Sequence, residues 1–232
     1  MHSPGVFFLI LRVSGKRYKV FDSERAVIFI DGNNFYHAVG KLGLSSVHLN
    51  YGRFSERLVM ERTWLETRYY VGKVPQKDDL TRYANQQKFI SALSQFDRVH
   101  HYLGRLERRL SKSAYQNRLT KWLNALDNRT DISVAGDIIA ELRKIADTPK
   151  LRYEEKAVDV MIATDMVSMA YQDKYDIAYL LSSDSDFVPA IETVRETDRK
   201  VFVASAAHAH KLAQVANVFI PLNREFFHGC WE

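Results

Sequence analysis

Aspartates lie within four residues of the ends of two short apolar runs of the sequence, and they are the residues best suited to chemistry. Asp31 comes after the run AVIFI, and Asp184 and Asp186 come after the run IAYLLS. Gly32 permits a tight turn directly after Asp31. In an open parallel α/β sheet, ligands bind at the carboxyl ends of the strands, so we expect these carboxylates to meet at one edge. A fourth acid, Asp159, lies in the first turn of a predicted helix that leads to the second run.

Some of these aspartates also have a simpler interpretation. An Asp in the first turn of a helix, such as Asp159, commonly caps the helix or interacts with its dipole. Asp186 can likewise cap the helix that begins near Pro189. As a group, however, carboxylates ~4 Å apart repel by about 4 kcal/mol per pair, and a cation must offset this repulsion. Mg²⁺ or Mn²⁺ is the predicted ion, because the chain has one cysteine, Cys230, and no well-spaced histidine pair to favour zinc.

The elements that must position these residues alternate in type along the chain. Short β-branched or aromatic runs predict strands at residues 26–30, 67–72, 98–104, 177–182, 200–205 and 218–222. Segments with helical periodicity predict helices at residues 79–95, 156–172, 189–196 and 208–216. This order is typical of an α/β domain with a mostly parallel sheet flanked by helices. No GxGxxG or GxxxxGK[ST] pattern opens these helices, which argues against dinucleotide binding and P-loop chemistry.

Residues 105–152 interrupt the alternation and predict an inserted helical hairpin. Apolar residues recur at helical spacing in both halves, and turn and capping residues separate the halves. The first half, residues 105–129, contains seven basic and two acidic residues, so its net charge is +5. Both ends of the insertion should lie at the carboxyl edge of the sheet. We therefore expect the basic hairpin to border the acidic site.

Basic and aromatic residues near this edge predict contacts with a polyanion. The candidate basic residues are Lys73, Arg108, Arg109 and Lys112. Tyr36, Tyr69 and Tyr70 are available to stack on unpaired bases. The alternative is that the basic helix face is only solvated and that Tyr69 or Tyr70 packs within the sheet.

The rest of the chain predicts one domain with short extensions. The 232 residues are 46% hydrophobic and 26% charged, and a net charge of +5 permits a polyanionic partner. We expect an N-terminal strand or hairpin at residues 1–25, the domain at residues 26–223 and a C-terminal tail at residues 224–232. The apolar run at residues 6–11 is shorter than the ~20 residues of a membrane helix, but it can pair with another copy of the chain. The single cysteine suggests a reducing, cytoplasmic location.

Three motifs together resemble a known family. They are IFIDGNN at residues 28–34, KAVD at residues 156–159 with Asp165 six residues later, and LSSDSDF at residues 181–187. Over roughly residues 25–223, they are similar to the NYN domain family, LabA-like branch, of the PIN-like nuclease superfamily. The resemblance implies a three-layer PIN-like α/β fold, an acidic metal site and hydrolysis of phosphodiester bonds in RNA.

The resemblance also assigns roles to individual residues. The implied ligands of Mg²⁺ or Mn²⁺ are Asp31, Asp159, Asp184 and Asp186. Asn34 matches the asparagine that supports the site, and Ala157 and Ser183 replace glycines that are common in the family. We expect Asn33, Ser183 and Ser185 to contact the substrate, with single-stranded RNA as the partner. A water activated by the metal would then attack the scissile phosphorus.

Three functions are open from the sequence. The first is a metal-dependent ribonuclease, and the second is an RNA-binding or regulatory NYN module with little turnover. The third, a phosphatase of the haloacid dehalogenase type, requires an Asp where this chain has Asn33. Asp165 lies ~240° around the helix from Asp159, so we expect it to be structural or to support the site from behind. His208 and His210 are predicted to lie on different faces and to bind no metal.

Overall fold

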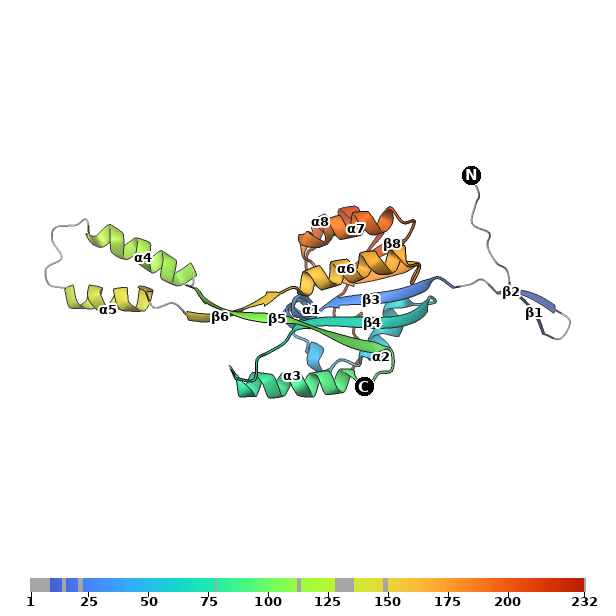
Figure 1. Cartoon of the computed structure of the whole chain (residues 1–232), viewed down its shortest axis with the longest axis horizontal. Coiled ribbons are helices and arrows are strands. Elements are labelled where there is room, and N and C mark those ends of the chain that lie inside the picture. The colour runs from blue at the N-terminus through green and yellow to red at the C-terminus, as the bar shows by residue number, and fades with distance from the viewer. Residues whose placement is uncertain are drawn as a thin grey trace. The chain divides into compact units, whose positions relative to one another are not determined.

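A seven-stranded sheet in the order β6-β5-β4-β3-β7-β8-β9 forms the core of the structure (Figure 1). The computed structural model describes residues 9–13, 16–20, 23–77, 79–111, 114–127, 136–147 and 150–231. The strands of the sheet are β3 (Arg25–Asp31), β4 (Thr63–Gly72), β5 (Val99–Ser111), β6 (Lys150–Lys156), β7 (Ile177–Leu181), β8 (Lys200–Ser205) and β9 (Val218–Pro221).

Six of these strands, β5-β4-β3-β7-β8-β9, pair in parallel. The predicted α/β class with a mostly parallel sheet is therefore confirmed. Strand β3 lies between β4 and β7, with Asp31 opposite Tyr70 and Ile30 opposite Leu181. Because parallel strands end on the same side, the end of β3 lies beside the residues that follow β7.

The central strand β3 is buried on both faces. Successive side chains of a strand point to opposite sides. Ala26, Ile28 and Ile30 accordingly belong to one core cluster, whereas Val27 and Phe29 belong to the other. The uninterrupted apolar run in the sequence is what a strand covered by helices on both faces requires.

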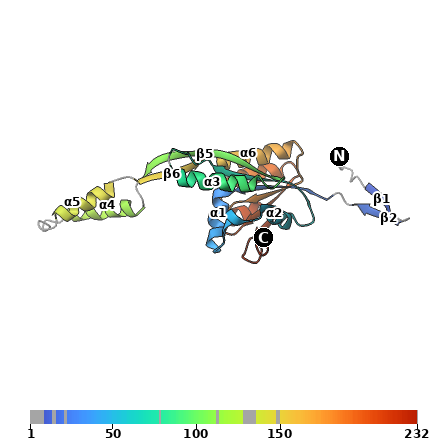
Figure 2. The same ribbon diagram turned by 90° about the horizontal axis from the view of Figure 1, so that it is seen from below.

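Helices cover both faces, which confirms the three-layer arrangement. The helices packed on the first face are α1 (Gly32–Lys41), α2 (Tyr51–Val59) and α3 (Leu80–Leu93). The helices packed on the second face are α6 (Val158–Tyr171), α7 (Val188–Arg195) and α8 (His210–Val215). On the first face, the rings of Phe35 in α1 and Phe54 in α2 lie 5.5 Å apart between centroids, and the two helices are neighbours (Figure 2).

Helices α1 and α2 are absent from the elements predicted by the sequence. Helix α1 begins with Gly32, Asn33 and Asn34, which are poor helix formers. It is stabilised instead by burial of Phe35 and Val39 against the sheet, and burial cannot be read from local propensity. Asp31 caps its N-terminus, so the candidate ligand also starts a helix.

The insertion differs from the prediction at both ends. Strand β5 continues to Ser111, where a helix was expected from residue 105, and β6 occupies Lys150–Lys156. The helices of the insertion are α4 (Ala114–Asp127) and α5 (Gly136–Asp147). Alternation of apolar and polar residues is weak in these strand segments, so periodicity did not separate them from the helices that follow.

The chain divides into two compact units. Residues 1–105 and 157–232 form the first, and residues 106–156 form the second. Within the second unit, the side-chain amide of Gln116 donates a hydrogen bond to the carbonyl of Ile145 (3.0 Å), which joins α4 to α5. Leu123 in α4 and Ala146 in α5 are both buried, and the two helices are in contact with each other.

The segments at the two ends of the chain contain ordered structure. Near the N-terminus, β1 (Leu9–Val13) pairs antiparallel with β2 (Lys16–Val20). Near the C-terminus, Phe227 and Cys230 are buried in the core of the first unit. In the described part of the chain, no helix has both the length and the apolar character that crossing a membrane requires.

Candidate active site

Asp31 is the buried centre of the acidic site. It is the last residue of β3 and only 6% exposed. The backbone N–H of Asn34 donates to its Oδ1 (3.1 Å), and the hydroxyl of Ser182 donates to its Oδ2 (3.0 Å). Both carboxylate oxygens are thus held in place, by the first turn of α1 on one side and by the end of β7 on the other.

Position 32 must be glycine because the start of α1 lies very close to β4. A Cβ at this position would lie 2.5 Å from Cε1 of Tyr69 and 2.6 Å from the carbonyl oxygen of Tyr70. The sequence suggested instead that Gly32 serves a tight turn. The absence of a side chain lets α1 start directly against β4, and this position places Asp31 at the sheet edge.

The pKa of Asp31 is raised from 3.8 to about 6. Burial is the main cause, because it disfavours the ionised carboxylate. The hydrogen bonds from Asn34 and Ser182 oppose this shift, whereas the negative charges of Asp159 and Asp184 add to it. The carboxylates of Asp31, Asp159 and Asp184 therefore repel one another, although the elements that carry them are distant in the sequence.

Ser182 links the two acids at the end of β7. Besides donating to Asp31, its hydroxyl accepts a hydrogen bond from the backbone N–H of Asp184 (3.1 Å). The side-chain oxygen of Asn34 accepts from both the N–H and the hydroxyl of Ser183 (3.1 Å each). Sequence reasoning missed the role of Ser182, since only its burial distinguishes it from the serines that follow.

Asp159 and Asp186 complete the acidic group. Asp159 lies in the first turn of α6, and partial burial of its carboxyl raises its pKa although the residue as a whole is exposed. The charges of Asp184 and Asp186 raise it further. Asp186 is exposed, and its N–H donates to Oδ1 of Asp184 (3.0 Å). Ala157 caps α6 in the left-handed region, at φ 70°.

The structure thus gathers all four predicted aspartates at the carboxyl edge of the sheet. They come from β3, the start of α6 and the turn after β7. Among the described residues, however, no group of three or more His, Cys, Asp or Glu side chains is arranged so that it could hold a metal ion. The carboxylates interact through their charges without forming a closed ligand cage.

Asp165 points away from this site, as its position on the helix suggests. Its Oδ2 accepts a hydrogen bond from the hydroxyl of Tyr70 (2.7 Å) and forms an ion pair with Arg68 (3.3 Å). The ring of Tyr70 stacks on Tyr102 at 4.9 Å. These contacts of Asp165 hold α6 against β4.

The proposed role of two tyrosines in base stacking is wrong. Tyr69 and Tyr70 are 3% and 0% exposed, and Tyr69 packs on Tyr51 with ring centroids 5.5 Å apart. Both side chains belong to the core. Tyr36, on α1, is 51% exposed and remains accessible.

The residues expected to contact substrate differ in how they are placed. Asn33 is exposed on the first turn of α1, and Ser185 is half-buried next to Asp184. Lys73 is exposed and directly follows β4. Its backbone N–H donates a hydrogen bond to the carbonyl oxygen of Gly104 (3.1 Å). Arg108 and Arg109 lie in β5 and not in a hairpin helix, whereas Lys112 lies outside the described residues.

Residues 91–223 match the NYN domain family. The chain belongs to this family. The matched range contains Asp159, Asp184 and Asp186, whereas Asp31 and Asn34 precede it. NYN domains belong to a nuclease-like superfamily, so the match agrees with an acidic edge of this kind.

The fold of this NYN protein is similar to that of a solved structure. A protein of unknown function from Vibrio parahaemolyticus is similar, with a TM-score of 0.53 and 18% sequence identity over 90% of this chain and 99% of that one. At this identity, the likeness concerns the fold alone. No curated protein matches the sequence.

Proposed function

We propose that this NYN protein is a ribonuclease that hydrolyses phosphodiester bonds of single-stranded RNA with Mg²⁺ or Mn²⁺. The observation that carries the proposal is the environment of Asp31. Acids buried this deeply normally have a cationic partner. Here the hydrogen-bond donors are the uncharged Asn34 and Ser182, and the neighbouring charges of Asp159 and Asp184 are negative. Among the described residues, no basic side chain acts on the Asp31 carboxyl, so a divalent cation would supply the compensating positive charge.

The donor atoms suit such a cation. Carboxylate oxygens are available from Asp31, Asp159, Asp184 and Asp186. Mg²⁺ and Mn²⁺ prefer such hard oxygen ligands, whereas zinc is more often bound by cysteine and histidine. When bound, the ion would supply Lewis acidity, which makes an attacking water more acidic and stabilises charge on the leaving oxygen. No cysteine or histidine belongs to this group of four.

The chain's own residues would fix the geometry around the scissile phosphate. Ser182 and the N–H of Asn34 orient the Asp31 carboxylate, and the side chain of Asn34 holds the turn that carries Asp184. Ser182 and Asn34 are thus positioning residues. Asn33 and Ser185 would donate hydrogen bonds to phosphate oxygens, and exposed Lys73 would contribute positive charge.

The experiment is incubation of the purified full chain with end-labelled single-stranded RNA, with Mn²⁺, Mg²⁺ or excess chelator. We expect cleavage with either ion, none with chelator, and none by the Asp31→Asn variant. Asp198→Asn is the matched control, because Asp198 is exposed and Asn tolerates its positive φ. Cleavage by Asp31→Asn at the wild-type rate would overturn the proposal.

A second function is an RNA-binding NYN module with little turnover. One observation favours it, namely that the described residues contain no closed group of three potential metal ligands. The same experiment separates the two functions. RNA binding without cleavage in every metal tested would support the binding module.

A further inference from the structure

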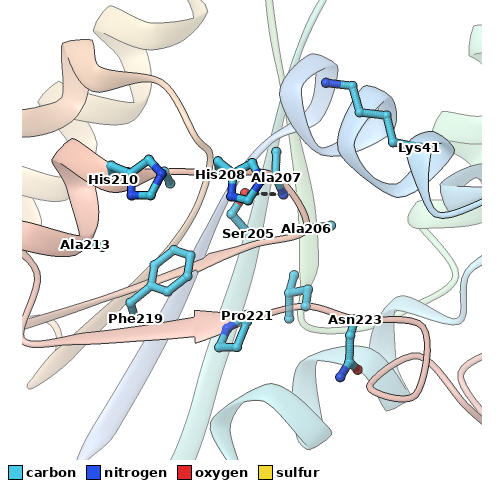
Figure 3. Close-up of a pocket in the computed structure, with 12 residues that line it drawn as sticks. Lys41, Ser205, Ala206, Ala207, His208, His210, Ala213, Phe219, Pro221 and Asn223 are labelled. Atoms are coloured by element: carbon cyan, nitrogen blue, oxygen red, sulfur yellow. Dashed lines mark hydrogen bonds between the residues drawn. The ribbon is translucent and has the colours of Figure 1, made fainter.

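A pocket lined by both polar and apolar residues lies at the carboxyl edge of the sheet, beyond the acidic site. It has a volume of about 520 Å³ and opens where β8 and β9 end and where α1 finishes (Figure 3). Ser205 is the last residue of β8, Pro221 is the last of β9, and Lys41 is the last of α1. None of the residues that line it is acidic.

The polar lining of this pocket is suited to an anion. Lys41, His208 and His210 are exposed, and none of them has an ion pair within the part of the chain that the structure describes. The rings of His208 and His210 are parallel, with centroids 5.6 Å apart and an interplanar angle of 4°. The expectation that these histidines face different ways is wrong, because α8 begins only at His210 and His208 precedes it in the loop.

The pocket also has surfaces for a sugar or a base. Half-buried Phe219 and exposed Pro221 form an apolar side, and Asn223 adds an amide group (Figure 3). The hydroxyl of Ser205 accepts a hydrogen bond from the N–H of Ala207 (3.0 Å), so its own hydrogen can be donated into the pocket. Positive charge, ring faces and amide groups together are the features that bind single-stranded nucleic acid.

The elements that line this pocket are neighbours of those that carry the acidic site. Strand β8 pairs directly with β7, and the turn after β7 carries Asp184 and Asp186. Helix α8, which begins at His210, contacts that turn. Neighbouring strands are ~4.8 Å apart, so β8 and β9 lie within ~10 Å of β7. An RNA strand that runs from the acidic site toward β9 would therefore pass over the pocket.

We propose that this pocket binds one nucleotide of the RNA strand next to the scissile bond. The proposal rests on the ribonuclease function and names a part of its substrate path. Lys41 and the imidazoles of His208 and His210 would contact a phosphate, while Phe219 and Asn223 would contact the base. The aspartates of the acidic site repel the phosphates of RNA. A neighbouring pocket without acidic residues and with a lysine would offset this repulsion.

The test uses the full chain with Asp31→Asn as the parent, so that binding is measured without cleavage. Fluorescence anisotropy gives the dissociation constant for labelled single-stranded RNA at several salt concentrations. Adding Lys41→Gln, His208→Ala and His210→Ala should weaken binding about tenfold or more. Loss of one phosphate contact should also reduce the slope of log K against log salt by about 0.7.

The matched control is Lys174→Gln in the same parent. Lys174 is exposed and precedes β7, at the opposite edge of the sheet, so its loss changes the charge equally without touching the pocket. We expect this control to bind RNA like the parent. Photocrosslinking of RNA that contains 4-thiouridine should label the segment from Ser205 to Asn223.

Two negative outcomes have different meanings. If the pocket variants bind RNA with the parent's affinity and salt slope, the pocket is not on the RNA path, although the ribonuclease proposal stands. If the parent binds no RNA at all while the wild-type chain cleaves none, both proposals are overturned.

Discussion

At the scale of single residues, burial of the Asp31 carboxyl lowers the stability of the folded chain once this carboxyl is ionised. Its carboxyl is 6% exposed and accepts two hydrogen bonds from uncharged donors, yet its pKa is raised to about 6. A folded-state pKa above the unfolded value means that ionisation favours the unfolded chain. Three of the four acids could be predicted from their positions after apolar runs, and Asp159 from its position at a helix start, but burial, which sets this pKa, could not.

The first prediction concerns stability against pH. As pH rises from about 4 to about 6, the unfolded chain loses the Asp31 proton before the folded chain does, so wild-type stability falls by up to about 3 kcal/mol. The Asp31→Asn variant should be more stable than wild type at pH 7, by roughly 1 to 3 kcal/mol, without added metal. This advantage should shrink toward pH 4. Urea unfolding across this range measures it, and a variant less stable than wild type at pH 7 would contradict the account.

The second prediction concerns Ser182. Replacing Ser182 by Ala leaves Oδ2 of Asp31 without its donor and the N–H of Asp184 without its acceptor. We expect a loss of about 1 to 3 kcal/mol in the free energy of unfolding and a higher pKa for Asp31. Ser183→Ala is the control, because the backbone N–H of Ser183 still donates to Asn34. Equal losses in the two variants would show that Ser182 has no special role.

At the scale of elements, the strands were easier to predict than the first two helices. Strands β3, β7 and β8 are continuous apolar runs, and their type follows from composition and length. Helix α1 could not be predicted by propensity, but Asp31 and Asn34 give a capping signal. Helix α2 has a comparable signal, since the side chain of Asn50 accepts from the N–H of Arg53.

The third prediction concerns the start of α6. Ala157 has φ 70°, a conformation that is unfavourable for residues with a Cβ and that glycine adopts freely. Ala157→Gly should therefore raise the free energy of unfolding by about 1 kcal/mol. Ala163→Gly, inside the same helix, should lower it by about 1 kcal/mol. Thermal unfolding measures both, and two changes of the same sign would contradict this interpretation.

At the scale of the whole molecule, positive charge is concentrated in one stretch of the sequence. The stretch from residue 105 to 129 has a net charge of +5, equal to that of the entire chain. Its sequence could be recognised as an insertion, but the lengths of β5 and β6 could not, because their pairing is made between segments about 40 residues apart.

The fourth prediction concerns that basic stretch. Changing Arg108, Arg109 and Lys112 together to Glu should weaken RNA binding and reduce its salt dependence. The affinity for Mn²⁺ should change less, since none of these residues belongs to the acidic group. Anisotropy with single-stranded RNA at moderate salt measures binding, and an unchanged dissociation constant would remove the basic stretch from the RNA path.

The central proposal is that Asp31, Asp159, Asp184 and Asp186 would together hold a divalent cation, with their side chains drawn closer around it than they lie in this structure. Calorimetric titration of the metal-free chain with Mn²⁺ tests it directly. We predict binding that strengthens as pH rises through about 6, where Asp31 ionises, and that weakens at least tenfold in Asp31→Asn and Asp184→Asn but not in Asp198→Asn. Equal Mn²⁺ affinity in all three variants and the wild type, or no binding by the wild type, would contradict the account.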